Sequence, residues 1–241
     1  MRQNTIHYNS VHSFPHTYLC NYLPLSTGRD KLSYSLLRFK RMQKPDLEAW
    51  IDCALEMPGP GFIAPGTTII RALHHNELHA GDQGPVALDL LGEALARNYA
   101  ASYLPDLLGK SRPARPIRGL GMDERVSELE GIYVLVGDLP AGPILLIDDI
   151  LTTAATMKAI IKAVLRANPR PSLQVFTLAR ADYTPLPGGS DPLRGLNFQF
   201  PAGLDWVVAE GPESYSPSPD RETLPPGSAT RLKVEIRADS W

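Results

Sequence analysis

The chain has little cysteine and little excess charge. Cys20 and Cys53 are the two cysteines among 241 residues, too few for a disulfide framework or a four-cysteine zinc site. We therefore expect two buried free thiols. The formal charge of −2 argues against bulk binding of nucleic acid, which requires a strongly basic surface.

Long apolar runs are also missing. No stretch approaches the roughly 20 apolar residues of a membrane-spanning helix, and the opening sequence, MRQNTIHYNSVHSF, lacks the apolar core of a secretion signal. We therefore expect no membrane partner and a cytoplasmic location. Apolar residues still make up 43% of the chain, which is enough for one substantial core.

The middle of the chain alternates helix and strand signals. The spacing of apolar residues predicts amphipathic helices in Pro45–Met57 and in Pro85–Leu104. Thr67–Leu73 and Leu173–Ala179 are short apolar or β-branched runs that predict buried strands. Tyr34–Arg41 fits either a strand or the start of a helix.

The ends of the chain are less regular than its middle. We expect an N-terminal segment at residues 1–60, an α/β core at 61–182, and a Pro- and Gly-rich extension at 183–241. Within that extension, Arg231–Arg237 alternates apolar and charged residues, which predicts an edge strand. Inside the core, Ser111–Arg125 is basic and has no apolar face, which predicts an exposed, mobile connection.

The segment Gly142–Asn168 has the most informative pattern. It reads GPILLIDDILTTAATMKAIIKAVLRAN, an apolar strand expected to end near Ile147, followed by a turn and a helix expected to begin near Ala154. The next strand, Leu173–Ala179, completes a β-turn-α-β unit, whose strands should be parallel. In a parallel sheet, ligands bind beyond the carboxyl ends of the strands.

The turn in this unit suits a sugar phosphate. Backbone amides at a helix start bind phosphate, and Thr hydroxyls add donors, so a phosphate could lie against the turn, whose residues are Leu151, Thr152, Thr153, Ala154, Ala155 and Thr156. The carboxylates of Asp148 and Asp149 would accept hydrogen bonds from sugar hydroxyls, and they also suit Mg²⁺. Helix capping without any ligand is the alternative.

Four apolar residues, Asp148-Asp149 and the threonine-rich turn resemble the 5-phosphoribosyl-1-pyrophosphate (PRPP) signature of type I phosphoribosyltransferases. The segment Arg112–Leu135, which begins RPARPIRGLGMDER, resembles a block of the ComF-like branch. The resemblance implies a mainly parallel sheet flanked by helices, with a variable hood over the acceptor that we expect the first 60 and last 60 residues to build. It also implies that the acidic pair holds the ribose hydroxyls and that the turn holds the 5′-phosphate.

The same resemblance suggests further site residues. The family places a pyrophosphate-binding loop, often with a non-proline cis peptide, where this chain has Arg71, Ala72 and Leu73. A mobile basic lid over the pyrophosphate would contain Lys110, Arg112, Arg115 and Arg118, and a solvated loop or a subunit contact is the alternative. His74, His75 and His79 have one acid nearby, Glu77, which favours a polar surface loop over a metal site.

The sequence also departs from the family pattern. Ala154 stands where the family usually has Gly, and a methyl group there costs about 1 kcal/mol if the backbone is left-handed. Ile117 and Glu128 replace the Gln and Asn that are usual in ComF-like sequences. The zinc ribbon of many ComF-like proteins is absent from this sequence.

Two functions follow from these observations. The first is a Mg²⁺-dependent phosphoribosyltransferase that uses PRPP and an unidentified, nucleobase-like acceptor, with Asp149 as the catalytic residue and Asp148 and Asp149 as metal ligands. The second is a regulator or competence-related protein that binds PRPP or a nucleotide without turnover. The resemblance adds the expectation of a homodimer.

Overall fold

The computed structural model describes residues 1–24, 31–59, 61–115 and 122–182. The predicted edge strand at Arg231–Arg237 lies outside these residues. The strands are β1 (Arg2–His7), β2 (Ser13–Tyr22), β3 (Thr68–Arg71), β4 (Ser102–Tyr103), β5 (Leu108–Lys110), β6 (Tyr133–Leu135), β7 (Ile144–Leu151) and β8 (Leu173–Ala181). The helices are α1 (Lys31–Lys40), α2 (Asp46–Glu56), α3 (Ala87–Tyr99), α4 (Met122–Leu129) and α5 (Ala155–Ala167), with a 3₁₀ turn at Pro105–Leu107.

A six-stranded sheet forms the centre of the fold, in the order β1-β2-β8-β7-β3-β4. β2, β8, β7, β3 and β4 pair in parallel with their neighbours, and β1 is antiparallel to β2. The expected mainly parallel α/β sheet is therefore confirmed. β5 and β6 form a separate antiparallel pair.

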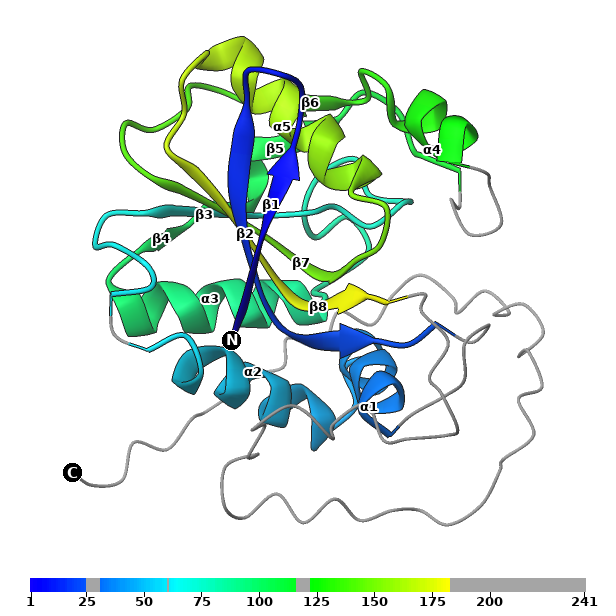
Figure 1. Cartoon of the computed structure of the whole chain (residues 1–241), viewed down its shortest axis with the longest axis vertical. Helices are drawn as coiled ribbons and strands as arrows, with labels where there is room; N and C mark the ends of the chain where they lie inside the picture. The colour runs from blue at the N-terminus through cyan, green and yellow to red at the C-terminus, as the bar shows by residue number, and fades with distance from the viewer. Residues whose placement is uncertain (25–30, 60, 116–121, 183–241) are drawn as a thin grey trace, which may run out of the picture. The chain divides into compact units, whose positions relative to one another are not determined.

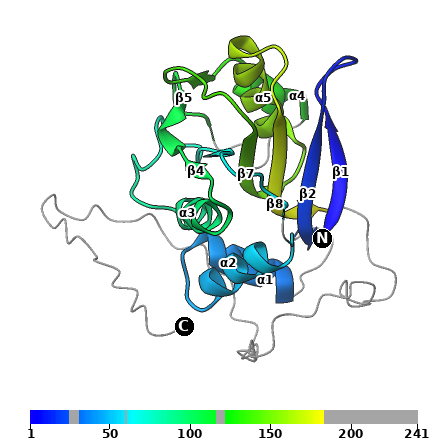
Figure 2. The ribbon, with the colours of Figure 1, turned by 90° about the vertical axis from the view of Figure 1, so that its left-hand side faces the viewer.

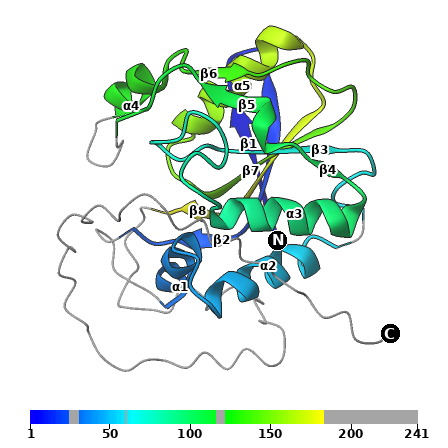
Figure 3. The same ribbon diagram turned by 180° about the vertical axis from the view of Figure 1, so that it is seen from behind.

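Helices cover both faces of the sheet. Figure 1 and Figure 3 show α1, α2 and α3 on one side, and α5 with the β5–β6 pair on the other. Each side has its own apolar core: Leu91, Leu95 and Trp50 pack on the first face, and Met157 and Ile160 on the second. Because β7 is covered on both sides, its first half, Ile144–Ile147, is apolar without alternation.

The N-terminal segment is an integral part of this layered structure. β2 pairs in parallel with β8, and β1 closes that edge of the sheet (Figure 2). Tyr34–Arg41, for which the sequence left strand and helix open, lies largely within α1. Ile6 and Phe14 join one apolar core, while Leu36 joins the other. Whether residues 1–60 also build a hood stays a prediction.

One helix is shorter than the sequence indicated. The apolar spacing predicts a helix over Pro85–Leu104, but α3 ends at Tyr99. Ala100 adopts a left-handed conformation, with φ 51° and ψ 42°, which ends the helix as a C-terminal cap. The chain then pairs with β3 as β4, so tertiary strand pairing overrides the helical pattern.

Both cysteines are buried free thiols, as expected. Burial, followed by nearby carboxylates, raises the pKa of Cys53 to about 12, so this thiol is inert at neutral pH. Among the described residues, no helix is both long enough and apolar enough to span a membrane.

A first prediction concerns the contact between α3 and β4. A methyl group at Gly92 would overlap the ring of Tyr103, with the ring carbon Cδ2 only 2.6 Å away. We expect Gly92→Ala to lower the free energy of unfolding by about 1–3 kcal/mol, because overpacking outweighs the better helix propensity of Ala. Urea denaturation measures this, with Glu93→Ala on the exposed neighbouring position as the control. A gain in stability would show that Tyr103 moves freely.

Candidate functional site

The acidic pair lies in the last half of a central strand. The sequence predicts that the strand ends near Ile147, but β7 continues to Leu151 because β8 still provides pairing partners there, up to Arg180. β3 has already ended at Arg71, opposite Ile147. Asp148 and Asp149 therefore extend past the end of β3, at the carboxyl edge of the parallel sheet, as predicted for a ligand site.

The two carboxylates are already partly satisfied. The backbone amide of Asp149 donates to Asp148 Oδ1 at 2.8 Å, and the amide of Ile150 donates to Asp149 Oδ1 at 2.6 Å. Burial, reinforced by the charge of Asp149, raises the pKa of Asp148. The negative charge of Asp148 is therefore less favourable here than that of an exposed carboxylate.

A lysine from the N-terminal segment reaches this pair. Lys40 Nζ, at the end of α1, lies 2.9 Å from Asp149 Oδ2. The carboxylate of Asp149 raises the pKa of Lys40, so the ammonium stays charged. Sequence reasoning missed Lys40 because the contact joins segments more than a hundred residues apart along the chain and has no local pattern.

The turn after β7 begins helix α5 in the predicted place. Leu151 and Ala155 are buried, while Thr152 is exposed and Thr153 is half-buried. Ala154 has φ 60° and ψ 8°, the left-handed conformation that the missing glycine suggested. Ala154 at the N-cap provides no side-chain hydrogen bond to the first turn of α5, and helix starts are the places where backbone amides bind anions.

The segment after β3 is held by a buried ion-pair network. The guanidinium of Arg71, with a side chain 0% exposed, donates twice to Glu77 at 2.8 Å and also pairs with Asp89. Glu77 accepts the amide of His74 at 2.6 Å as well. Burial opposes the charge of Glu77, but these hydrogen bonds lower its pKa overall. Arg71 therefore points into the protein and fixes the loop from within.

The backbone of this loop is also engaged. Ala72 donates to Ile147 O at 2.9 Å, and its carbonyl accepts from Arg71 at 3.1 Å. Among the described residues the cis peptide is Lys44-Pro45, so the family's non-proline cis peptide is not present at Arg71, Ala72 or Leu73. Their role toward pyrophosphate stays a prediction.

Lys110 lies in a different environment from the one expected for a lid residue. It is buried in β5, and its ammonium donates to His74 O at 2.6 Å and to Leu73 O at 3.3 Å. Burial lowers its pKa to about 8. Lys110 thus holds the loop after β3 in place, because its ammonium donates hydrogen bonds to two backbone carbonyls of that loop.

The next basic residues lie against α4. Arg112 pairs with Glu128 at 2.7 Å, and the same carboxylate accepts the amide of Arg115 at 2.9 Å. Ala114 donates to His75 O at 3.0 Å, which joins this segment to the loop after β3. Arg118, the remaining predicted lid residue, lies outside the described part of the chain.

The histidines form no metal site. The rings of His74 and His75 lie 4.2 Å apart, and both have pKa values lowered mainly by burial. Within the described ranges, no group of three or more His, Cys, Asp or Glu side chains could hold a metal ion. His74 and His79 are exposed and His75 is half-buried, whereas Glu77 is buried.

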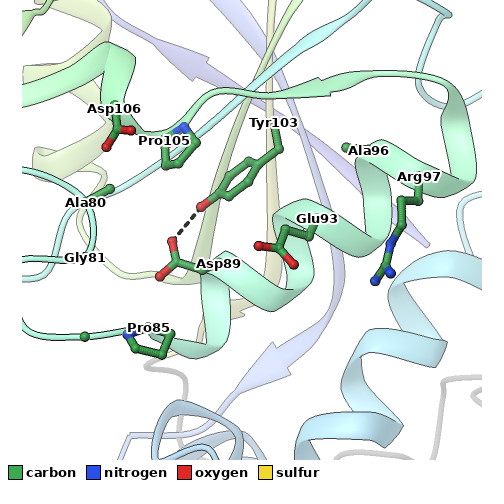
Figure 4. A pocket seen from close by; sticks show the side chains of 11 residues that line it. Ala80, Gly81, Pro85, Asp89, Glu93, Ala96, Arg97, Tyr103, Pro105 and Asp106 are labelled. Carbon is green, nitrogen blue, oxygen red and sulfur yellow. Dashed lines mark hydrogen bonds between the residues drawn. The ribbon is translucent and has the colours of Figure 1, made fainter. Parts of the chain in front are cut away.

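A surface pocket of about 740 Å³ is lined by Asp89, which belongs to the ion-pair network, and by other residues of α3 and the neighbouring loops. Figure 4 shows Tyr103 and Asp89 joined by a hydrogen bond of 2.7 Å at its wall. Glu93 and Arg97 of α3 also line the pocket, as does Asp106, which lies beside Pro105. The acidic pair and the turn into α5 do not line this pocket, so it is separate from the predicted ribose-phosphate site.

The chain resembles one adenine phosphoribosyltransferase among the solved structures, that from Leishmania tarentolae. The two share 15% sequence identity with a TM-score of 0.36, and the match covers 68% of this chain and 85% of the other. No family model and no curated protein matches the chain. A likeness this distant does not establish a shared substrate or reaction.

A second prediction tests the strained turn. Ala154→Gly should raise the free energy of unfolding by about 1 kcal/mol, because Gly adopts φ 60° without the Cβ clash. Ala155→Gly is the matched control: it lies at the first position of α5 and should lose stability because Gly favours the unfolded chain there. Thermal and urea unfolding measure both. Equal losses in the two variants would contradict the left-handed turn.

A third prediction tests the buried network. Glu77→Gln removes the charge opposite Arg71, and both side chains are 0% exposed, so we expect a loss of about 3–5 kcal/mol. Glu130→Gln is the control, because Glu130 pairs with Lys162 on the surface with 67% of its side chain exposed and should lose less than about 1 kcal/mol. Similar losses in the two variants would show that Arg71 is not held by Glu77.

Proposed function

We propose that the protein is a phosphoribosyltransferase, which binds PRPP at the carboxyl end of β7 and transfers its ribose 5-phosphate group to a small, nucleobase-like acceptor. One observation carries the proposal: two carboxylates extend past the end of β3 and are followed at once by an uncapped helix start with a left-handed residue. A ribose 5-phosphate needs acceptors for its hydroxyls close to donors for its phosphate, and the proposal assigns these to the acidic pair and to the turn that follows it.

Each part of the sugar phosphate then has a matching group. Asp148 and Asp149 accept hydrogen bonds from the ribose hydroxyls. The residues Leu151, Thr152, Thr153, Ala154, Ala155 and Thr156 provide the amides and hydroxyls for the 5′-phosphate. When the bond between C1 and the pyrophosphate oxygen breaks, the ring gains positive charge, and the carboxylate of Asp149 stabilises it.

The proposal includes Mg²⁺, whose chemistry is to bind oxygens of the donor's pyrophosphate and neutralise charge on the leaving group. Asp148 and Asp149 are the predicted protein ligands. One oxygen of each already accepts a backbone amide, and Asp149 Oδ2 pairs with Lys40. In the proposal the ion is therefore held by oxygens of the donor and by water, without a direct bond to Asp149.

The proposal gives the remaining residues supporting parts. The loop at Arg71, Ala72 and Leu73 would lie along the pyrophosphate, fixed from within by its ion-pair network. Arg112 and Arg115, with Arg118, would bring positive charge to the leaving group, while Lys110 anchors the loop. A homodimer belongs to the proposal on the family resemblance alone, and an elution volume of a monomer would remove it.

A binding protein without turnover is the second candidate. The methyl group of Ala154 favours it, because the strained residue lies within the predicted phosphate turn and glycine would allow a closer approach of the ligand. Release of pyrophosphate from PRPP, tested against a panel of nucleobases, distinguishes the two candidates: turnover with any base identifies the enzyme.

A fourth prediction tests the ribose site. Asp149→Asn should weaken binding of PRPP about ten- to a hundredfold, since a charge-assisted hydrogen bond contributes about 1.5–3 kcal/mol. Calorimetric titration with Mg²⁺ present measures this.

Thr153→Val tests the phosphate site instead. It should weaken the binding of ribose 5-phosphate and of PRPP alike and leave the binding of pyrophosphate nearly unchanged. No binding of either sugar phosphate to the wild-type protein at millimolar concentration would end the proposal.

A further inference from the structure

Lys40 is held in place by a packed helix pair. It is the last residue of α1, a helix whose Leu36 and Phe39 are almost completely buried. Asp46 at the start of α2 accepts hydrogen bonds from Ser35 and from Arg38 of α1. Because the second half of α1 is packed and hydrogen-bonded to the start of α2, the backbone of Lys40 is held in place, and its ammonium lies beside Asp149.

The ammonium of Lys40 lies where a cation bound to the acidic pair would lie. Lys40 Nζ lies 2.9 Å from Asp149 Oδ2, and its side chain remains 41% exposed. Its charge also acts on Asp148 and on His74. The lysine therefore faces the carboxylates from the side of the N-terminal segment, while the loop after β3 bounds the site from another side.

Little uncompensated negative charge is left at Asp149 to attract a divalent ion. Asp149 and Lys40 neutralise each other, and one oxygen of each aspartate is already bonded to a backbone amide. Mg²⁺ binds where carboxylates are unpaired and where water can complete six ligands. To bind Asp149 directly, it would have to displace an ammonium that is held by charge and by its helix.

We propose that Lys40 is the built-in counter-ion of the acidic pair: it takes the place of a protein-bound divalent cation on Asp149, so that a sugar diol binds there without such a cation. The part that concerns the diol rests on the proposed function, and the part that concerns the metal does not. Lys40 is a positioning residue, since its ammonium neutralises and orients the carboxylate that contacts the sugar.

The metal part is tested with Mn²⁺ alone, followed by electron paramagnetic resonance and calorimetry. The wild-type protein should bind no Mn²⁺ at the acidic pair. Lys40→Met, which keeps the length and apolar stem of the side chain, should bind Mn²⁺ at least about tenfold more tightly, because two adjacent carboxylates lose their compensating charge. Adding Asp149→Asn to Lys40→Met should remove that binding.

Two control variants separate charge from folding. Lys44→Met removes a lysine of the same segment, 75% exposed and paired with Glu48, and should behave as wild type. Lys40→Arg keeps the charge and should also bind no Mn²⁺. The proposal is overturned if wild type binds Mn²⁺ in an Asp149-dependent way, if Lys40→Arg does so, or if Lys40→Met folds with an unchanged melting temperature and still binds none.

The sugar part is tested with ribose 5-phosphate, titrated once in the presence of a chelator and once with Mg²⁺. Wild-type affinity should be the same within about twofold in both conditions, whereas Lys40→Met should bind at least about tenfold more weakly in the chelator and recover with Mg²⁺. A strict Mg²⁺ requirement in the wild type would overturn this part. Failure of ribose 5-phosphate to bind at all would instead overturn the proposed function, and the Mn²⁺ result would still decide the role of Lys40.

Discussion

The parallel pairing between β7 and β8 is the constraint on which the candidate site depends. β3 ends at Arg71, yet β8 continues to pair with β7 as far as Leu151. The last residues of β7 therefore pair with β8 on one side and no longer pair with β3 on the other, where the loop after β3 begins. Asp148 and Asp149 lie in this free portion, so the unequal lengths of two strands open the site.

Cations from distant segments stabilise the backbone around this opening. Arg71 binds Glu77 and Asp89 in the interior, Lys110 binds the carbonyls of the loop after β3, and Lys40 binds Asp149. A buried charge without a partner would cost several kcal/mol, so the contacts of Arg71 and Lys110 restrict the conformations of the loop after β3. A loop fixed in this way would lower the entropic cost of the proposed binding.

The sequence predicted much of the site but only part of its surroundings. The strand, the turn and α5 lie close to where the sequence predicts them. Their pattern of apolar residues, acidic pair and threonine-rich turn depends on local spacing. The same reasoning indicated that Ala154 would be strained if left-handed, and the structure places it at φ 60°. It misjudged the end of β7, the end of α3 and the exposure of Lys110, since all three depend on partners that are remote in the chain.

What the sequence determined by itself is the parallel β-turn-α-β unit and the chemistry of its carboxyl end, because hydrophobic period and helix-start residues act over a few positions. Tertiary structure alone decided which groups meet there. Lys40 lies in a helix that the sequence left open between strand and helix, and it reaches Asp149 only because β2 pairs with β8 and places α1 beside the site. In the sequence, Arg71 and Lys110 cannot be told from basic residues on the surface. In the folded chain Arg71 binds Glu77 and Lys110 binds carbonyls of the loop after β3, so both stabilise the structure. A contact between remote segments leaves no local period in a sequence, so only the folded chain reveals it.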